Sequence, residues 1–290
     1  MELMKKLTDY WQDNLAIDRK EESENWIQAK KALHEQRGHK VPHISGQGKV
    51  IRDMVLERDE MKVNYLLGVT FLIKQGDHFY REEEQREHVA SFYKGTLVED
   101  QLKSDEPSSQ EDTPNIEKDV LSRSQKEQRF SYDRHATVQY AERWWNDYNP
   151  AYKQFDVDCT NYVSQCLHAG GAPMRGYPDR SKGWWYQNEK WSYSWSVAHA
   201  LRWYLSGSKQ GLKGKAIEKP EQLIPGDVIC YDFEGDGKWD HNTIVVSKDA
   251  NGMPLVNAHT NNSRHRYWDY KDSYAWTSNC QYKFFRIGED

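Results

Sequence analysis

The first part of the chain has apolar residues at the spacing of a helix. One stripe runs through Leu3, Leu7, Tyr10, Trp11, Asn14 and Leu15, and a second through Trp26, Ile27, Lys30 and Leu33. Positions three and four apart share a helix face, so the stripes predict helix from residue 1 to about 37, where Gly38 ends it. From Lys49 to Val98 short apolar runs separated by turn signals predict antiparallel strands instead. We therefore predict an N-terminal α+β domain, residues 1–100, built from helix followed by a β-meander.

A charged run, residues 80–88, lies inside this strand region. Its carboxylates alternate along the chain without the ligand spacing of a metal site. We therefore expect a solvated strand face there rather than a bound ion.

The composition changes after residue 100. From about Asp100 to Lys126 the sequence is polar, contains proline and serine and has almost no aromatic residues. This composition favours a flexible linker, which we assign to residues 101–130. The sequence beyond it is rich in Trp and Tyr, which indicates a second domain at residues 131–290.

Helical spacing returns in the second domain. The pattern predicts one helix within residues 132–148 and another within residues 197–205. A third, short helix is predicted from residues that recur at i, i+3, i+4, i+7 and i+8, namely Cys159, Tyr162, Val163, Cys166 and Leu167. It begins near Cys159, and Gly170 and Gly171 stop it.

Strands follow these helices. Residues 223–231 read as a turn that leads into a strand, and residues 240–247 read as a second strand. Asn251-Gly252 is a strong hairpin signal and joins that strand to a third one at residues 254–260. The second domain is therefore also predicted to be α+β, with helices packed on an antiparallel sheet.

Cys159 is the candidate nucleophile of this domain. Asp158 is a credible N-cap, and unpaired amides together with the positive end of the helix dipole favour a thiolate at the first helical turn. A thiolate attacks acyl carbon, and the same amides can hold the oxyanion that forms. A lone cysteine under a helix is more often an inert core residue, so its partners decide the interpretation. Cys166, two turns further on, is expected in the core.

Two histidines are candidate partners. His241 opens one strand and His259 lies near the end of its antiparallel neighbour, so the hairpin brings both to one end of the sheet. A Cys at a helix start, a His on a strand edge and a polar group on the next strand have the roles of nucleophile, base and orienter of the base. Asn257 shares a strand face with His259 and is a rival orienter.

These residues together resemble a known family, the bacterial putative amidase domain. The resemblance covers roughly residues 131–288 and rests on four motifs in order. They are the run from Asp158 to Leu167 with Gly170-Gly171, the turn Pro225-Gly226-Asp227, Asp240-His241 before an apolar strand, and the run from Asn257 to Thr260. That family is related to the NlpC-like and CHAP cysteine amidases and peptidases of the papain-like group.

The resemblance implies a papain-like domain whose Cys-bearing helix packs on an antiparallel sheet. It implies that Cys159 is the nucleophile, His241 the general base and later the acid, and His259 the residue that holds the His241 ring. The expected substrate is a peptide or muropeptide, such as the peptides of peptidoglycan. Two alternatives stay open: an acyltransferase or peptidase with an intracellular substrate, and a catalytically silent binding domain of the same fold.

Several other residues are candidates for support. Asp158 and Asn161, in the first turn of the helix, could support the site, and for Asn161 a purely structural role is equally expected. A cluster of indoles could line a substrate groove, although aromatic residues more often pack in a core. Its members are Trp184, Trp185, Trp195 and Trp239.

Composition excludes several function classes. The net charge of −5 gives no reason to expect nucleic acid as a partner. No stretch approaches the length of a transmembrane helix and the first residues contain no signal-peptide core, so we expect a cytoplasmic protein and leave cell-wall or extracellular association open. Residues 232–237 match the opening of a calcium loop, but Thr243 stands where a bidentate Glu is expected. We therefore predict no metal and no cofactor.

Overall fold

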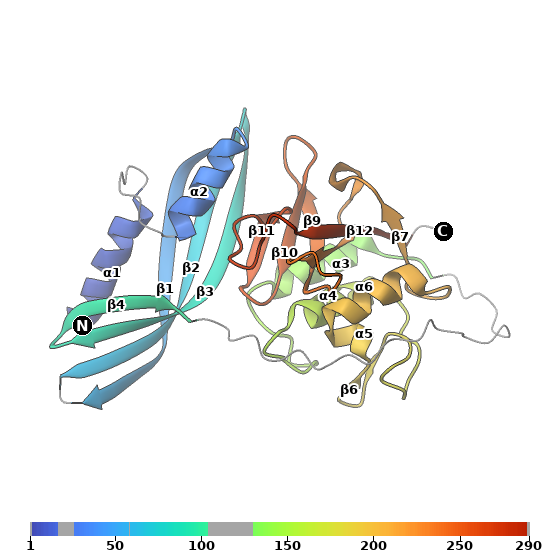
Figure 1. The fold of residues 1–290 in the computed structure, drawn as a ribbon, viewed down its shortest axis with the longest axis horizontal. Helices are drawn as coiled ribbons and strands as arrows, with labels where there is room; N and C mark the ends of the chain where they lie inside the picture. The colour runs from blue at the N-terminus through green and yellow to red at the C-terminus, as the bar shows by residue number, and fades with distance from the viewer. Residues whose placement is uncertain (1, 17–25, 58, 104–129, 289–290) are drawn as a thin grey trace. The chain divides into compact units, whose positions relative to one another are not determined.

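The computed structural model describes residues 2–16, 26–57, 59–103 and 130–288. The chain divides into two units, Met1–Glu106 and Pro107–Asp290. Each unit contains helices and an antiparallel sheet, so the protein is of the mixed α/β class (Figure 1). The predicted linker falls mostly on residues 104–129, outside the described residues. None of the described helices is both long and apolar enough to cross a membrane.

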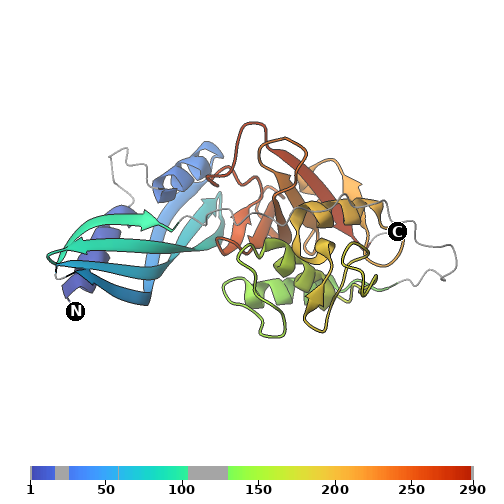
Figure 2. The same ribbon diagram turned by 60° about the horizontal axis from the view of Figure 1, so that its bottom comes forward.

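The N-terminal unit packs two helices on one face of a four-stranded meander (Figure 2). Its elements are α1 (Glu2–Leu15), α2 (Trp26–Gln36), β1 (Lys40–Glu57), β2 (Glu60–Gln75), β3 (His78–Tyr93) and β4 (Thr96–Leu102). Neighbouring strands pair antiparallel in chain order. The single helix predicted for residues 1–37 is thus two helices, and residues 17–25 between them are not described. The strands begin earlier than expected, since Pro42, Gly46 and Gly48 obscure the start of β1 in the sequence.

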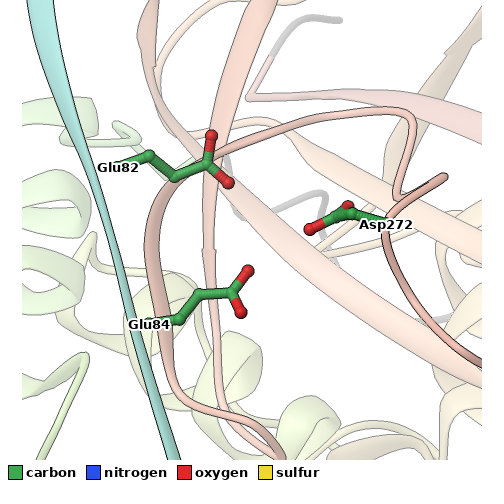
Figure 3. Close-up of side chains that lie close together, drawn as sticks. All are labelled: Glu82, Glu84 and Asp272. Atoms are coloured by element: carbon green, nitrogen blue, oxygen red, sulfur yellow. The ribbon is translucent and has the colours of Figure 1, made fainter. Parts of the chain in front are cut away.

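The charged run on β3 is not a solvated face, and that expectation was wrong. Successive side chains of a strand alternate between its faces, so Glu82 and Glu84 point to the same side of β3 (Figure 3), the side that α2 covers. Lys30 on α2 forms ion pairs with both carboxylates. His34 Nε2 lies 3.0 Å from Glu82 and Arg86 Nη2 lies 2.9 Å from Glu84. Asp272, also labelled in Figure 3, belongs to the C-terminal unit.

The C-terminal unit packs helices on an antiparallel sheet of order β11-β10-β9-β8-β12-β7. The strands are β7 (Gly214–Ile217), β8 (Val228–Asp232), β9 (His241–Lys248), β10 (Pro254–Ala258), β11 (Ser263–Tyr267) and β12 (Gln281–Ile287). The helices are α3 (Arg134–Trp144), α4 (Cys159–Ala169), α5 (Tyr193–Ser196) and α6 (Ala198–Gly207), with a 3-10 turn at Pro220–Gln222. Strands β5 (Tyr186–Gln187) and β6 (Lys190–Trp191) form a separate hairpin.

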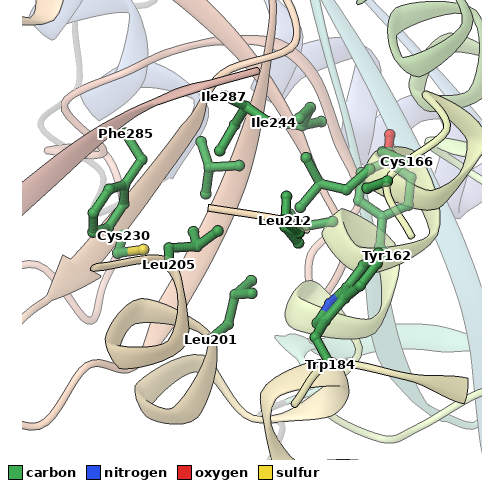
Figure 4. Packing of buried hydrophobic residues seen from close by; sticks show 14 of the residues in the cluster. Tyr162, Cys166, Trp184, Leu201, Leu205, Leu212, Cys230, Ile244, Phe285 and Ile287 are labelled. Atoms are coloured by element: carbon green, nitrogen blue, oxygen red, sulfur yellow. The ribbon is translucent and has the colours of Figure 1, made fainter. Parts of the chain in front are cut away.

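Both faces of this sheet are buried. The helices α3, α4 and α6 lie on one face, where Tyr162 and Cys166 of α4 belong to one buried cluster with Cys230 and Ile244 of the sheet (Figure 4). The predicted core position of Cys166 is therefore confirmed. On the opposite face a second cluster joins Tyr231 and Val245 to side chains from the loops, among them Phe233 and Tyr270. The sequence of β8 and β9 reads as a continuous buried run for this reason.

Asp227 ties the beginning of the unit to its end. It follows the Pro225-Gly226 turn and is fully buried. Its carboxylate pairs with Arg134 Nη1 at 2.7 Å and with Arg286 Nε at 2.9 Å. It also accepts hydrogen bonds from the backbone amides of Ile224 and Ile287. This motif of the resemblance therefore has a structural role, because a buried carboxylate needs such partners.

Candidate active site

Cys159 is the first residue of α4, as the sequence predicted, and Asp158 occupies the N-cap position. The Asp158 side chain does not cap the helix in the usual way. Its Oδ1 accepts hydrogen bonds from Asn161 Nδ2 at 2.8 Å and from the backbone amide of Phe155 at 3.0 Å. Its Oδ2 lies 2.7 Å from Nδ1 of His259. The carboxylate thus organises the turn that leads into the helix.

The thiol of Cys159 is buried, with 1% of the residue exposed. Its Sγ lies 3.7 Å from Thr160 Oγ1 and beside the backbone amide of Asn242. Burial raises the pKa of the Cys159 thiol, and these hydrogen bonds only partly offset it. In this conformation desolvation outweighs the stabilising hydrogen bonds, so the cysteine is a thiol rather than the thiolate expected from its place at a helix start.

His241 is the first residue of β9, and its ring packs among aromatic side chains. The ring centroids of Tyr231, Phe233 and Tyr270 lie 5.6, 6.1 and 5.0 Å from its own. Its Nε2 lies 3.1 Å from the hydroxyl of Tyr270. Burial, with the nearby charge of Arg266, lowers the pKa of His241 to about 3, so the imidazole is neutral near pH 7.

The side chain of His241 points away from α4. Asn242 faces the helix, since its Nδ2 donates to Thr160 Oγ1 at 2.9 Å. The preceding residue on a strand projects to the other face, and the rings around His241 belong to the cluster there. Within the described residues, His241 makes its hydrogen bond with Tyr270 and none with Cys159. The Sγ nevertheless lies beside the backbone amide of Asn242, the residue that follows His241.

His259 does not hold the His241 ring, contrary to the expectation from the resemblance. Its Nδ1 faces Asp158, and its Nε2 lies 2.7 Å from the carbonyl oxygen of Trp144. The ring stacks on Tyr162 with centroids 4.0 Å apart. Both partners are oxygen acceptors, so both ring nitrogens of His259 are engaged inside the unit. His259, which follows the last residue of β10, therefore contacts both the N-cap of α4 and the end of α3.

Asn257 faces the helices as well. Its backbone pairs with Ile244, which packs under α4, so strand register places both side chains on the face opposite to His241. Its Nδ2 donates to Glu142 Oε1 at 3.1 Å and its Oδ1 accepts from the amide of His265. The rival orienter is thus also engaged elsewhere. The face shared by Asn257 and His259 was predicted from alternation, but the face of His241 requires the register between two strands.

Tyr270 was missed by the sequence analysis. It lies in the loop between β11 and β12, where no periodicity or motif marks a functional residue. Its backbone φ is 57°, in the left-handed region that a bulky side chain rarely adopts.

Asn161 has a structural role, as Asp158 does, since its side-chain Oδ1 accepts a hydrogen bond from Trp195 Nε1 at 2.8 Å.

The four tryptophans that were predicted to line a substrate groove do not line one. The indoles are 0–8% exposed and belong to the interior of the unit; they are Trp184, Trp185, Trp195 and Trp239. The indole N–H groups of Trp184, Trp185 and Trp195 find partners inside the protein, as Trp184 Nε1 does with Ser164 Oγ at 2.9 Å. Large aromatic side chains are used here for packing, and the groove prediction was wrong.

The loop at residues 232–237, which resembles the opening of a calcium loop, is shaped by hydrogen bonds to one carboxylate. Asp232 accepts from the backbone amides of Gly235, Asp236 and Gly237. Oxygens of Asp232, Glu234 and Asp240 lie within 4.8 Å of one another, so they form the one group in this unit that has metal-ligand geometry among the described residues. Burial and the neighbouring carboxylates raise the pKa of Asp240 to about 7. An acidic cluster alone does not identify an ion site.

Comparisons with known proteins show the family of this chain. A family model described as "Putative amidase domain" matches residues 131–285. The chain is 46% identical over 275 residues to "Uncharacterized protein YhbB" of Bacillus subtilis (strain 168), which covers 91% of this chain and 86% of that protein. It is 34% identical over 140 residues to "Uncharacterized protein YjcM" of the same organism, covering 45% of this chain and 31% of that protein. No solved structure matches the chain.

Proposed function

Since this chain belongs to the family described as "Putative amidase domain", we propose that its C-terminal unit hydrolyses amide bonds, with Cys159 as nucleophile and His241 as base and acid. In this proposal the unit has the papain-like arrangement of the NlpC-like and CHAP amidases. The observation that carries it is the position of Cys159 at the first residue of α4, with its thiol beside the amide of Asn242, next to His241.

The proposed reaction starts from neutral groups. The thiol of Cys159 gives its proton to the neutral imidazole of His241 as the sulfur attacks the carbonyl carbon. The first backbone N–H groups of α4 have no acceptor within the helix and are donors for the oxyanion. The imidazolium then protonates the leaving amine, and water attacks the thioester and releases the acid. The raised pKa of Cys159 and the lowered pKa of His241 favour this general-base route over a preformed thiolate–imidazolium pair.

The proposed substrates are peptides or muropeptides. This choice follows the resemblance to amidases that cut peptidoglycan peptides, and the interior position of the indoles gives it no extra support. Asp158 and His259 keep the start of α4 in place in this scheme, and they act on the nucleophile rather than on the base.

A catalytically silent binding domain is the second candidate. The observation in its favour is that Cys159 is buried while the side chain of His241 lies on the other face of the sheet. An enzyme of this kind needs a local rearrangement at the beginning of β9 before the proton can move. A binding domain needs none.

The two candidates are separated by a hydrolysis assay on the full chain. Peptides and muropeptides are incubated with the wild type and with Cys159→Ala, His241→Gln and Cys280→Ser, and amine release is followed by mass spectrometry. Cys280 is the described cysteine that is not buried and serves as the matched control. We expect the first two variants to lose activity by about 1,000-fold or more, as removal of a nucleophile or its base does, and Cys280→Ser to keep it.

Each outcome has a clear meaning. Hydrolysis that survives Cys159→Ala would place the nucleophile elsewhere. A wild type that binds the peptides but releases no amine, even with hydroxylamine added to capture an acyl group, would establish the silent binding domain. Turnover with hydroxylamine or a second amine, but not with water, would identify an acyltransferase.

A further inference from the structure

His241 has one hydrogen-bond partner in the described residues, and that partner comes from a loop. The hydroxyl of Tyr270 lies 3.1 Å from Nε2 of His241 in a buried setting. The other ring nitrogen, Nδ1, makes no hydrogen bond within the described residues. An imidazole with one nitrogen held and one available is arranged for proton transfer at the second nitrogen.

Tyr270 is itself held firmly in place. The guanidinium carbon of Arg266 lies 3.9 Å from the centroid of its ring, and Arg266 pairs with Asp272 at 3.0 Å. The hydroxyl of Ser263 lies 3.4 Å from the hydroxyl of Tyr270. The backbone at Tyr270 is left-handed, and such strain persists where the surroundings fix one conformation, often at functional sites.

We propose that Tyr270 is a positioning residue for His241. Its oxygen accepts the Nε2–H of the neutral imidazole and its own O–H donates to Ser263, which leaves the lone pair of His241 on Nδ1. This inference rests on the proposed function, in which Nδ1 receives the proton of Cys159 once the start of β9 has rearranged. Tyr270 can hold the imidazolium as well as the neutral ring, because Nε2 carries a proton in both states.

The direction of the hydrogen bond follows from the chemistry. If Tyr270 donated its O–H to Nε2, the single proton of a neutral imidazole would sit on Nδ1, and His241 could take no proton from a thiol there. Ser263 offers an acceptor for the Tyr270 hydroxyl, so the chain from His241 through Tyr270 to Ser263 satisfies each member. Neither Asn257 nor His259 can perform this role from the opposite face.

The tautomer of His241 tests the inference without any substrate. Nitrogen NMR of the full chain with labelled histidine, at pH 7, distinguishes a protonated ring nitrogen from one with a lone pair, and His241→Gln assigns the signal. We expect the wild type to carry its proton on Nε2. Tyr270→Phe removes the acceptor and is expected to redistribute the two tautomers. A wild type protonated on Nδ1 would overturn the proposal, and this measurement needs no variant of Tyr270.

Tyr231→Phe is the matched control. Its ring also packs on His241, but its hydroxyl bonds to Thr243 and to the carbonyl oxygen of Trp268 instead. We expect the tautomer to remain as in the wild type in this variant. The same tautomer in Tyr270→Phe as in the wild type would also contradict the proposal. If an amide substrate is cleaved, kcat should fall about 10- to 100-fold in Tyr270→Phe with little change in KM, by analogy with the loss of the hydrogen-bond partner that orients a metal-bound imidazole.

Discussion

The carboxylate of Asp158 lies 2.7 Å from Nδ1 of His259, 101 residues further along the chain. Both side chains are buried, with 2% and 3% exposed. The contact fixes the start of α4 relative to the end of β10, so a change at His259 acts on the position of the Cys159 helix. It does not act on the hydrogen bond of His241.

We expect His259→Ala to destabilise the C-terminal unit by about 3–5 kcal/mol, because it leaves the Asp158 charge buried with one partner fewer. Urea unfolding followed by fluorescence measures this change. His135→Ala, at an exposed position of α3, is the control and should stay within about 0.5 kcal/mol of the wild type. An unchanged stability together with a complete loss of hydrolysis would restore His259 as a direct partner of His241.

Asp227→Asn should also destabilise the unit, by about 3–5 kcal/mol, since two arginines lose their charged partner and an amide cannot accept all the hydrogen bonds of the carboxylate. Asp179→Asn removes a carboxylate that pairs with Lys182 on the surface and should change stability far less than Asp227→Asn does. Equal effects in the two variants, measured by denaturant unfolding, would show that Asp227 is not an anchor.

Alkylation of the native protein should reach Cys280 first and Cys159 late. Burial raises the pKa of the Cys159 thiol, so its thiolate is scarce at neutral pH and its rate should rise only under alkaline conditions. Mass spectrometry of peptides after iodoacetamide treatment at pH 6 to pH 10 reports both rates. Faster labelling of Cys159 than of Cys280 at pH 6 would mean that the thiol is activated and exposed in solution.

Stability should fall on the acid side of neutrality through His241. Its folded pKa of about 3 lies below the ordinary value, so the contribution is present above about pH 6.5 and is lost as pH falls from there towards 3. The loss amounts to at most about 5 kcal/mol, from 1.36 kcal/mol for each pKa unit. Unfolding free energies between pH 7 and pH 4 should decline less steeply in His241→Gln. Parallel curves for the variant and the wild type would contradict the buried, neutral imidazole.

Local pattern was a good guide where neighbours in sequence decide the structure. The beginning of α4 at Cys159, the core position of Cys166 and the strands on either side of Asn251-Gly252 follow from spacing and turn residues. These features depend on contacts a few residues apart, which periodicity reports directly.

Features set by distant partners could not be read in the same way. Glu82 and Glu84 look solvated until Lys30, more than 50 residues earlier, is placed above them. The face of His241 depends on the register between β9 and β10, and Tyr270 reaches it from a loop without regular structure. The partners of buried charges and the positions of loop residues therefore follow only from the three-dimensional structure.

The anchor at Asp227 also brings the two ends of the C-terminal unit together. Arg134 lies near the first described residue of the unit and Ile287 near the last, and both contact the same carboxylate. Domains whose ends meet tolerate a new chain start elsewhere. A circular permutant of this unit, with its present ends joined by a short linker and opened at the Asn251-Gly252 turn, should therefore fold with the same sheet order.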